Sequence, residues 1–300
     1  MKNDFIYYIA FVAIKVLNAL PRNLALMLGG FLGEVWYLIG NRDRQIAYSQ
    51  MHRVLNLSHK QLKAHVRACF ETMGKNLIDV LRLGQWSARQ IGSLVDIEGL
   101  EHFDNAYKQG KGIICLTGHI GNFELMAATF SAYKGYKISV IGRELYDKRF
   151  DKMLVDQREK FGIENIPTTT SIKAIMKSLK EGHALGILMD LDSTRVSGYF
   201  IDFFGKKAIT AAGPMFIARK TGAPVVPIAI YRKPDDRYLV RVLPELKLEW
   251  TDNKDEDIKK ALAKCNHALE EMILYDPLQW VWVHNRWRTR PPEEKKEVAA

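Results

Sequence analysis

The apolar positions of the chain follow two spacings, which divide the sequence into an N-terminal helical part and a longer part with mixed elements. Residues 5–20 and 24–40 are two apolar stretches that follow each other directly. In residues 59–83, apolar side chains recur every three or four positions, as is typical of an amphipathic helix. From residue 112 onward, short apolar runs alternate with helical stretches. This alternation predicts an α/β fold, with a mostly parallel central sheet flanked by helices.

The individual elements of the sheet region can be assigned from the apolar runs and the residues that flank them. Thr210 is a candidate N-cap of one helix and Gly222 a candidate for the position just after its end, while Pro214 is tolerable in its first turns. Asp276 and Pro277 should end the last helix. We expect strands in residues 112–119, 137–144, 184–192, 223–231 and 238–246, and helices in residues 123–132, 149–161, 171–180, 210–221 and 258–274.

The two N-terminal stretches can be interpreted as buried core helices or as a membrane attachment. Residues 5–20 are shorter than the roughly 20 apolar residues that a transmembrane helix needs, and Pro21 follows where a signal peptide would have its cleavage site. We favour attachment, as a short span or a partly embedded hairpin, because Lys15 can extend to the interface and Arg42 and Arg44 suit an anionic leaflet. The expected organisation is a membrane-associating helical segment at residues 1–44, an α/β domain at 45–290 and a flexible tail at 291–300.

Composition narrows the class of partner without identifying it. The net charge of +10 favours an acidic partner, which can be a nucleic acid, an anionic lipid or an acidic carrier protein. Hydrophobic residues make up 47% of the chain, enough for a sizeable core. The cysteines (Cys69, Cys115 and Cys265) are odd in number, far apart and set in apolar patterns. We interpret them as reduced core residues of a cytoplasm-facing protein rather than as disulfides or metal ligands.

Candidate chemistry centres on residues 117–126, with the sequence TGHIGNFELM. His119 stands in a glycine-flanked turn sequence, and Glu124 follows it five positions later. On one continuous helix, five steps of about 100° would place the two side chains roughly 140° apart. They can meet only if His119 lies in a turn and Glu124 in the first turn of the next helix. The spacing therefore predicts a junction between a loop and a helix.

Three of the expected strands end in polar residues. His119 follows the first strand, Arg143 the second, and Asp190 and Asp192 the third. In open α/β sheets, sites form in the crevice beyond the carboxyl ends of the strands. We therefore expect a base, a cation and one or two carboxylates to converge at one edge of the sheet.

The available groups favour general-base chemistry over covalent or metal-dependent chemistry. The sequence has no G-x-S-x-G motif, and His119 lacks the i, i+4 histidine of a helical zinc site, so we expect neither an acyl-enzyme nor a metal or cofactor. We interpret His119 as the base that deprotonates a hydroxyl, with Glu124 holding the other ring nitrogen. Backbone amides at Gly121 and Asn122 can receive developing negative charge, and Arg143 suits phosphate or carboxylate recognition. Taken alone, His119 is better explained as a structural turn histidine, and it is the combination with the flanking glycines, Glu124, Arg143 and Asp190 that favours catalysis.

The segment GHIGNFE is similar to the H-x4-[DE] motif of glycerolipid acyltransferases, and in this form it resembles the bacterial lipid A biosynthesis acyltransferases. The segments KQGKGIICLTGHIGNFE, GRELYD, MDLD, YFIDFFGKKAITAAGPMFIARKTGAPVVPIAIYR and WVWVHNRWRTRPP recur in the order of that family. The resemblance covers nearly the whole chain. It implies an inner-membrane enzyme, with its active domain on the cytoplasmic face, that transfers a fatty acyl chain from acyl carrier protein to a hydroxyl of a lipid A precursor.

The resemblance also implies roles for individual residues. His119 and Glu124 are the implied catalytic pair, and Arg143 and Asp190 are implied to bind or order the polar part of the substrate site. The family pattern has a glutamine after the first aspartate of MDLD, where this chain has Leu191. Substrate binding by Asp192 is therefore less directly implied. Lys206 and Lys207 are candidates for head-group phosphate contacts or for solvated surface charges.

Other interpretations stay open at this point. A nucleic-acid-binding protein would explain the charge but not the apolar N-terminus, and the sequence has no clustered basic helix. A non-catalytic membrane scaffold is disfavoured by the intact His119 and Glu124. Within the enzyme class, the acceptor can instead be a mannosylated phosphoinositide or glycerol phosphate, and the donor a coenzyme A thioester. For Trp280, Trp282 and Trp287, we favour packing in the core over a belt at the membrane interface. We assign no catalytic role to His284, which lies between them.

Overall fold

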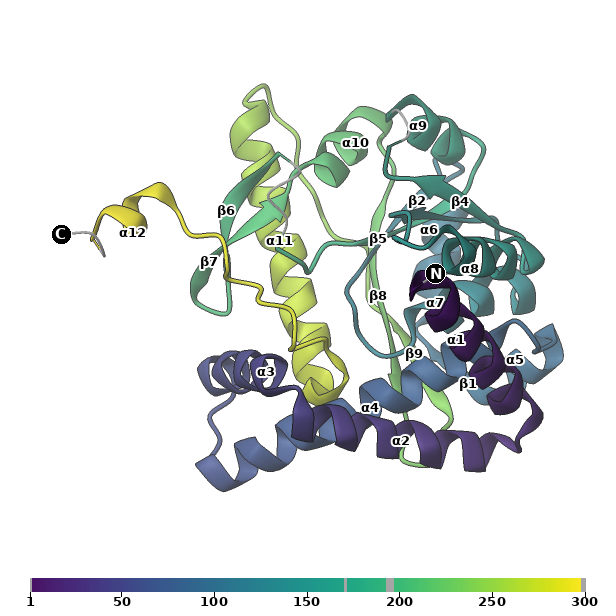
Figure 1. Ribbon diagram of the computed structural model, residues 1–300. Coiled ribbons are helices and arrows are strands. Elements are labelled where there is room, and N and C mark those ends of the chain that lie inside the picture. Colours follow the sequence, from purple (N-terminus) through teal and green to yellow (C-terminus); the bar gives the residue numbers. More distant parts are fainter. Residues whose placement is uncertain (1, 170–171, 193–196, 298–300) are drawn as a thin grey trace.

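A computed structural model describes residues 2–169, 172–192 and 197–297 of the chain (Figure 1). Its centre is a seven-stranded sheet with the order β1-β9-β8-β2-β5-β3-β4, and a separate two-stranded hairpin is formed by β6 and β7. The strands are β1 (Val95–Glu98), β2 (Ile113–Thr117), β3 (Ile138–Gly142), β4 (Ile163–Pro167), β5 (Ala184–Leu188), β6 (Gly198–Phe203), β7 (Lys206–Ala211), β8 (Val225–Arg232) and β9 (Tyr238–Val242).

Helices cover both faces of this sheet, and others form the N-terminal part of the chain. They are α1 (Lys2–Ala19), α2 (Arg22–Ile39), α3 (Asn41–Val54), α4 (His59–Leu83), α5 (Ala88–Leu94), α6 (Leu100–Tyr107), α7 (Phe123–Ala128), α8 (Lys148–Lys160), α9 (Ile172–Lys180), α10 (Gly213–Thr221), α11 (Lys254–Tyr275) and α12 (Pro292–Glu297). A π-helical turn, η1 (Thr129–Tyr133), continues α7, and a 3-10 turn, η2 (Pro277–Gln279), follows α11.

The predicted α/β class and the mostly parallel sheet are confirmed. Five strands run parallel, and β9 pairs antiparallel with β8 and parallel with β1. The central strands are apolar along their whole length because both faces are covered. In β2, Ile114 and Leu116 face one core, while Ile113 and Cys115 face the other. All three cysteines are free and buried, as expected from their apolar surroundings.

Some element boundaries differ from the predicted ones for identifiable reasons. Thr210 lies in β7 rather than at a helix N-cap, so α10 begins at Gly213, while Gly222 ends it in the left-handed region at φ +67° as expected. The hairpin β6–β7 was not predicted, and its turn places both Phe204 and Gly205 at positive φ, as a two-residue hairpin requires. Ser171, assigned to a helix from the sequence, lies outside the described residues.

The N-terminal segment is helical, but its helices are short. No single helix among the described residues is long and apolar enough to cross a bilayer; α2 and α3 pass such a test only together, and they are bent by 91°. The predicted boundary at residue 44 falls inside α3, and α12 occupies part of the predicted flexible tail. Large apolar side chains are exposed along α1 and α2: Tyr8, Ile9, Val12, Val16, Leu24, Met27, Leu28, Phe31, Leu32, Leu38 and Ile39.

Helix α2 packs against α4 through glycines. A Cβ on Gly33 would lie 2.3 Å from the carbonyl oxygen of Phe70, and one on Gly74 would lie 2.1 Å from the carbonyl oxygen of Gly29. These backbones touch, so no side chain fits between them. By contrast, a Cβ on Gly30 would meet the flexible side chain of Glu71 at 3.3 Å.

We expect Gly33→Ala to lower the free energy of unfolding by about 1–3 kcal/mol, because the added methyl group must push α2 and α4 apart. Gly30→Ala is the matched control on the same helix. It should be neutral or stabilising by up to about 1 kcal/mol, because alanine is the better helix former. Thermal or urea unfolding of the two purified variants measures the difference. Equal stabilities would contradict the close packing described here.

Candidate active site

The histidine singled out in the sequence lies in a short loop between β2 and α7, residues 118–122, which we call the His119 loop. The side chain of His119 is 27% exposed, and its Nδ1 lies 2.9 Å from Oδ1 of Asp190, which is fully buried after β5. The backbone N–H of His119 donates to Oδ2 of the same carboxylate at 2.7 Å. Strands β2 and β5 are parallel neighbours, so their carboxyl ends bring these two residues together as the topology predicts.

The carboxylate of Asp190 fixes the tautomer of His119. An ionised carboxylate can only accept hydrogen bonds, so Nδ1 must carry the proton. The indole Nε1 of Trp280 also donates to Asp190 Oδ2, at 2.7 Å, which gives this carboxylate three donors. The lone pair of the imidazole is therefore on Nε2, and His119 can act as a base through that atom.

Electrostatics support this assignment. Burial lowers the pKa of His119, but the charge of Asp190, the hydrogen bond to it and the charge of Glu124 outweigh that effect, so the pKa lies above its ordinary value of 6.5. Burial raises the pKa of Asp190, but His119 and the indole donor together bring it below its ordinary value. The pair therefore stabilises an imidazolium next to a carboxylate, as proton transfer to His119 requires.

Two glycines make this geometry possible. A Cβ on Gly118 would lie 3.1 Å from the carboxyl group of Asp190. Gly121 has φ +59°, and a Cβ there would lie 2.0 Å from the carbonyl oxygen of Ile230. The loop thus needs one glycine for the approach of the carboxylate and another for its backbone conformation.

The contact expected between His119 and Glu124 is not formed, because Asp190 occupies the second ring nitrogen. Glu124 is in the first turn of α7, as predicted, but it forms a two-fold ion pair with Arg158 of α8. The distances are 3.0 Å from Nε to Oε2 and 2.5 Å from Nη2 to Oε1. A catalytic role of Glu124 stays a prediction, and the orienting role passes to Asp190.

One of the two backbone amides expected to stabilise negative charge already has a partner. The N–H of Gly121 donates to the carbonyl oxygen of Gln279 at 2.9 Å and is not available to a substrate. The side chain of Asn122 caps α7 by accepting from the N–H of Leu125 at 3.0 Å, and the role expected of its backbone N–H stays a prediction. The spacing of residues in the sequence did not indicate that Gln279, near the C-terminus, would bind the backbone of this loop.

Of the two other predicted substrate-binding residues, Arg143 is exposed and Asp192 is buried. Arg143 is exposed just after β3. Asp192 is buried and accepts hydrogen bonds from Arg288 and from the N–H and Oγ1 of Thr289, at 2.7–3.0 Å. These contacts favour a structural role for Asp192. Its predicted contact with the substrate stays a prediction.

The C-terminal segment of residues 279–290, which we call the C-terminal strap, completes the site. Trp280, Trp282 and Trp287 are all buried in the core, which confirms the interpretation favoured from the sequence. The N–H of Val281 donates to the carbonyl oxygen of His119 at 3.2 Å, and Ile120 and Trp280 form an antiparallel bridge. The contacts of the strap with the His119 loop and the pairing of Glu124 with Arg158 were not predicted from the sequence.

A narrow apolar cavity lies next to the Glu124–Arg158 pair. It follows strands β2, β3 and β5 and is closed by side chains of α6 and α7. Because its lining is almost entirely hydrocarbon, it suits an unbranched apolar chain. Its lining includes Phe103, Phe123, Met126, Phe130, Val140 and Gly186.

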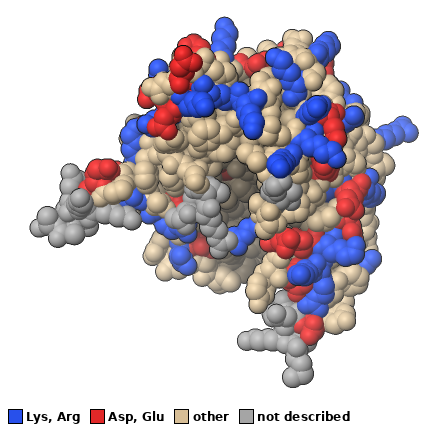
Figure 2. Space-filling model, turned by 90° about the horizontal axis from the view of Figure 1, so that it is seen from above, with Lys and Arg blue, Asp and Glu red and all other residues tan. Residues whose placement is uncertain are grey.

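Positive charge gathers at one end of the molecule. Figure 2 shows this face, which is hollowed near its centre and carries Lys and Arg side chains around the hollow. It is formed over α9, α10 and the start of α11. The exposed lysines of α9 and α10 are Lys173, Lys177, Lys180 and Lys220, and the exposed charged residues at the start of α11 are Lys254, Asp255, Glu256 and Lys260.

Comparison with known proteins places the chain among enzymes of lipid biosynthesis. The profile of the family described as bacterial lipid A biosynthesis acyltransferase matches residues 1–289. The chain is 28% identical to the lipid A biosynthesis lauroyltransferase of Escherichia coli (strain K12), over 95% of this chain and 93% of that protein. It is 25% identical to the lipid A biosynthesis palmitoleoyltransferase of the same strain, over 75% and 72%. It is 23% identical to a phosphatidylinositol mannoside acyltransferase of Mycolicibacterium smegmatis, over 77% and 75%. These matches confirm the resemblance found in the sequence.

Proposed function

Since the chain belongs to the bacterial lipid A biosynthesis acyltransferase family, we propose that it transfers a fatty acyl chain from an acyl carrier protein thioester to a hydroxyl group of a lipid A precursor. The observation that carries this proposal is the pair His119–Asp190, which leaves Nε2 as a base near an apolar cavity. Similarity to the mycobacterial enzyme keeps a mannosylated phosphoinositide as the second candidate acceptor.

The reaction follows from the groups present. Nε2 of His119 removes the proton of the acceptor hydroxyl as its oxygen attacks the thioester carbonyl. The carboxylate of Asp190 stabilises the imidazolium that forms. As the tetrahedral intermediate collapses, the C–S bond breaks, and the imidazolium returns the proton to the departing thiolate. The products are an ester and a free carrier thiol.

The donor and the membrane are part of the same proposal. The lysines over α9, α10 and α11 support an acidic donor such as acyl carrier protein, because opposite charge speeds encounter between proteins. The exposed apolar side chains of α1 and α2 support attachment to the cytoplasmic face of the inner membrane, with the apolar residues in the acyl layer. Fractionation of cells that express the chain tests the attachment.

The proposed function is tested by mass spectrometry of lipid A after deletion of the gene, followed by restoration with the wild type or with His119→Ala. Loss of one secondary acyl chain on deletion, restored only by the wild type, is the expected result. Purified enzyme with acyl carrier protein and coenzyme A thioesters then identifies the donor. An unchanged lipid A profile on deletion would overturn the assignment to this pathway.

The cavity predicts how the acyl chain is selected. Gly186 lines it about two residues below the end of β5, and a Cβ there would meet Val140 at an ordinary 3.5 Å. We expect Gly186→Leu to fill the part of the cavity beside Gly186 and to shift the preferred donor to a shorter acyl chain. The rate with the original donor should fall by about tenfold or more. Gly186→Ala is the control that adds one methyl group and should keep the preference. Competition between donors of different length measures the shift, and an unchanged preference in the leucine variant would place the acyl chain elsewhere.

A further inference from the structure

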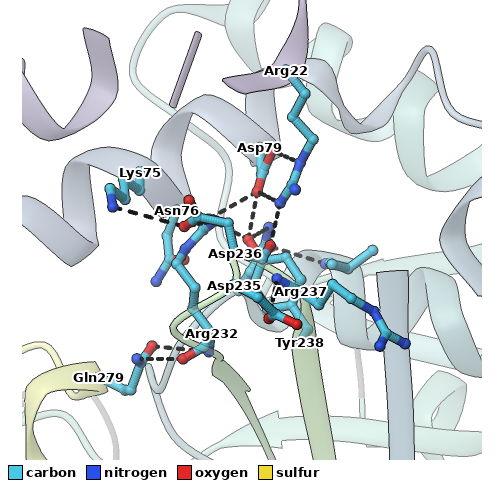
Figure 3. A network of polar contacts seen from close by, with 12 residues as sticks. Arg22, Lys75, Asn76, Asp79, Arg232, Asp235, Asp236, Arg237, Tyr238 and Gln279 are labelled. Atoms are coloured by element: carbon cyan, nitrogen blue, oxygen red, sulfur yellow. Dashed lines mark hydrogen bonds and ion pairs between the residues drawn. The ribbon is translucent and has the colours of Figure 1, made fainter. Parts of the chain in front are cut away.

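A buried cluster of charges connects the N-terminal helices to the sheet (Figure 3). Its centre is Asp79 of α4, whose side chain is fully buried. Arg22, the first residue of α2, donates to both of its oxygens, at 3.1 Å and 2.7 Å. Arg232, at the end of β8, and the hydroxyl of Tyr238 donate to Oδ2 at 2.8 Å and 2.7 Å.

The cluster includes a second carboxylate, that of Asp236, which also lies 3.8 Å from Nζ of Lys75. Asp236, in the turn between β8 and β9, accepts from Arg232 at 3.3 Å, and its carbonyl oxygen accepts from Arg22 at 2.6 Å. Asn76 holds the Nε of Arg232 at 3.0 Å. Burial and the charge of Asp79 raise the pKa of Tyr238, so its hydroxyl remains a donor. Two guanidinium groups and two carboxylates thus hold α2, α4 and the β8–β9 turn at one point.

The cluster is connected to the His119 loop through Gln279. The side-chain amide of Gln279 bonds to both backbone groups of Arg232: Oε1 accepts from the N–H at 3.3 Å, and Nε2 donates to the carbonyl oxygen at 3.2 Å. Its own carbonyl oxygen accepts from the N–H of Gly121 at 2.9 Å. Gln279 is buried and therefore has one defined position between β8 and the loop.

The two residues that follow Gln279 contact both His119 and Asp190, which form the catalytic pair of the proposed reaction. Trp280 donates to Asp190, and Val281 donates to the backbone of His119. A shift of Gln279 therefore moves the donor to the carboxylate and the loop that carries the imidazole together. Misplacement of reacting groups by about 1 Å can cost on the order of 10²-fold in rate.

Buried ion pairs contribute little net stability compared with apolar residues of similar size, but they fix the relative placement of the groups that they join. Here they join the first turn of α2 to β8. The opposite face of α2, away from α4, exposes a row of large apolar side chains, which the proposed membrane attachment would cover. We propose that Arg22 and Gln279 are positioning residues, at the two ends of a polar connection that runs from α2 through Asp79 and Arg232 to the His119 loop.

This inference rests on the proposed acyl transfer, because turnover is its readout. It predicts that the catalytic pair is aligned when α2 is held against Asp79. Loss of the connection should lower kcat and leave the KM of donor and acceptor nearly unchanged, because none of the residues that join α2 to the loop lines the cavity. A residue with a merely structural role would lower thermal stability without this division between kcat and KM.

A second ion pair between the same two helices provides the control. Arg67 of α4 donates its Nε to both oxygens of Glu34 of α2 at 2.7 Å, and both residues lie at the surface. Arg67→Gln and Arg22→Gln therefore each remove one ion pair between α2 and α4. Only the second is connected to the His119 loop.

The experiment measures kcat and KM of detergent-purified, full-length variants, with thermal unfolding alongside, at a temperature at which every variant is folded. We expect Arg22→Gln to lower kcat by about tenfold or more with KM changes below about twofold. Arg22→Lys, which keeps one charged donor to Asp79, should recover part of kcat, and Arg67→Gln should match the wild type.

Gln279→Glu tests the other end of the connection without a change in size. A carboxylate accepts from the N–H of Arg232 but cannot donate to its carbonyl oxygen, so half of the link to Arg232 is lost, together with the bond that Nε2 of Gln279 donates to Asp276 at 3.1 Å. It should reproduce the kcat loss of Arg22→Gln. Wild-type kcat in folded Arg22→Gln and Gln279→Glu, or an equal loss in Arg67→Gln, would overturn the inference. If the wild-type enzyme shows no more turnover than His119→Ala, the proposed function is overturned instead.

Discussion

Asp190→Asn is expected to lower kcat for acyl transfer by about 10²–10⁴-fold, close to the loss expected for His119→Ala. Asparagine keeps the size of the side chain, but its amide nitrogen can face Nδ1 of His119 only as a donor. The proton of the imidazole then moves to Nε2, the atom that must accept the proton of the substrate. The fold should change little, because the amide oxygen can still accept from Trp280 or from the N–H of His119.

Turnover of purified single and double variants measures this effect. The double variant His119→Ala, Asp190→Asn should be no slower than His119→Ala alone, because the two residues act as one unit. Asp96→Asn is the control, since Asp96 binds Lys233 and Arg237 at the surface and should be neutral. Nearly wild-type turnover of Asp190→Asn would show that Asp190 does not orient the base.

The pH dependence follows from the same pair. The charges that face His119 are Asp190 after β5 and Glu124 on α7, and His284 on the strap interacts with it weakly. The carboxylates raise the pKa of His119 above 6.5, and only the neutral imidazole is a base. Activity should therefore rise with pH through a value above 6.5. In Asp190→Asn this limb should move toward lower pH, because the attraction that holds the proton is lost.

Glu124→Gln should produce the largest loss of stability, about 3–5 kcal/mol, because it leaves the guanidinium of Arg158 buried without its counter-charge. The two side chains are 9% and 12% exposed, so water cannot replace the lost partner. Glu124→Asp should retain more stability and more activity, because a shorter carboxylate still pairs with Arg158. Urea unfolding of the variants measures the effect.

Removing both charges distinguishes the structural effect of the Glu124–Arg158 ion pair from a role of Glu124 in the reaction. Glu124→Leu with Arg158→Met leaves no buried charge and should recover much of the stability lost in Glu124→Gln. If this double variant is stable but inactive, Glu124 has a role in the reaction beyond its ion pair. Stability of Glu124→Gln equal to that of the wild type would contradict the buried pair described here.

The sequence predicted the site where topology decides it and failed where a distant contact decides it. The carboxyl ends of parallel strands lie at one edge of a sheet, so the apolar runs predicted that His119 and Asp190 would lie at the same edge; their direct contact depends on the pairing of β2 with β5, which the runs do not show. The partner of Glu124 was misassigned because a five-residue spacing suggests a local contact. Arg158 lies 34 residues later on α8, and nothing in the periodicity of that helix marks it.

Weak apolar patterns explain the missed elements of the fold. Strand β4 buries only Ile163 and Ile166 fully, at a sheet edge, so its apolar pattern is short and interrupted. The hairpin β6–β7 packs against the buried tryptophans of the strap rather than in the main sheet, and its pairing depends on that contact. Such contacts are properties of the tertiary structure and are not encoded in local spacing.

The C-terminal strap imposes an order on how the enzyme becomes competent during its own synthesis. The ribosome delivers α1 and α2 first, and it delivers the nine strands of the described residues before Trp280 and Val281, which hold Asp190 and the His119 loop. The apolar N-terminal helices can therefore reach a membrane while the nascent chain still lacks the donors that align its catalytic pair. The contacts that hold His119 and Asp190 in place therefore form only after residues 280 and 281 have been made.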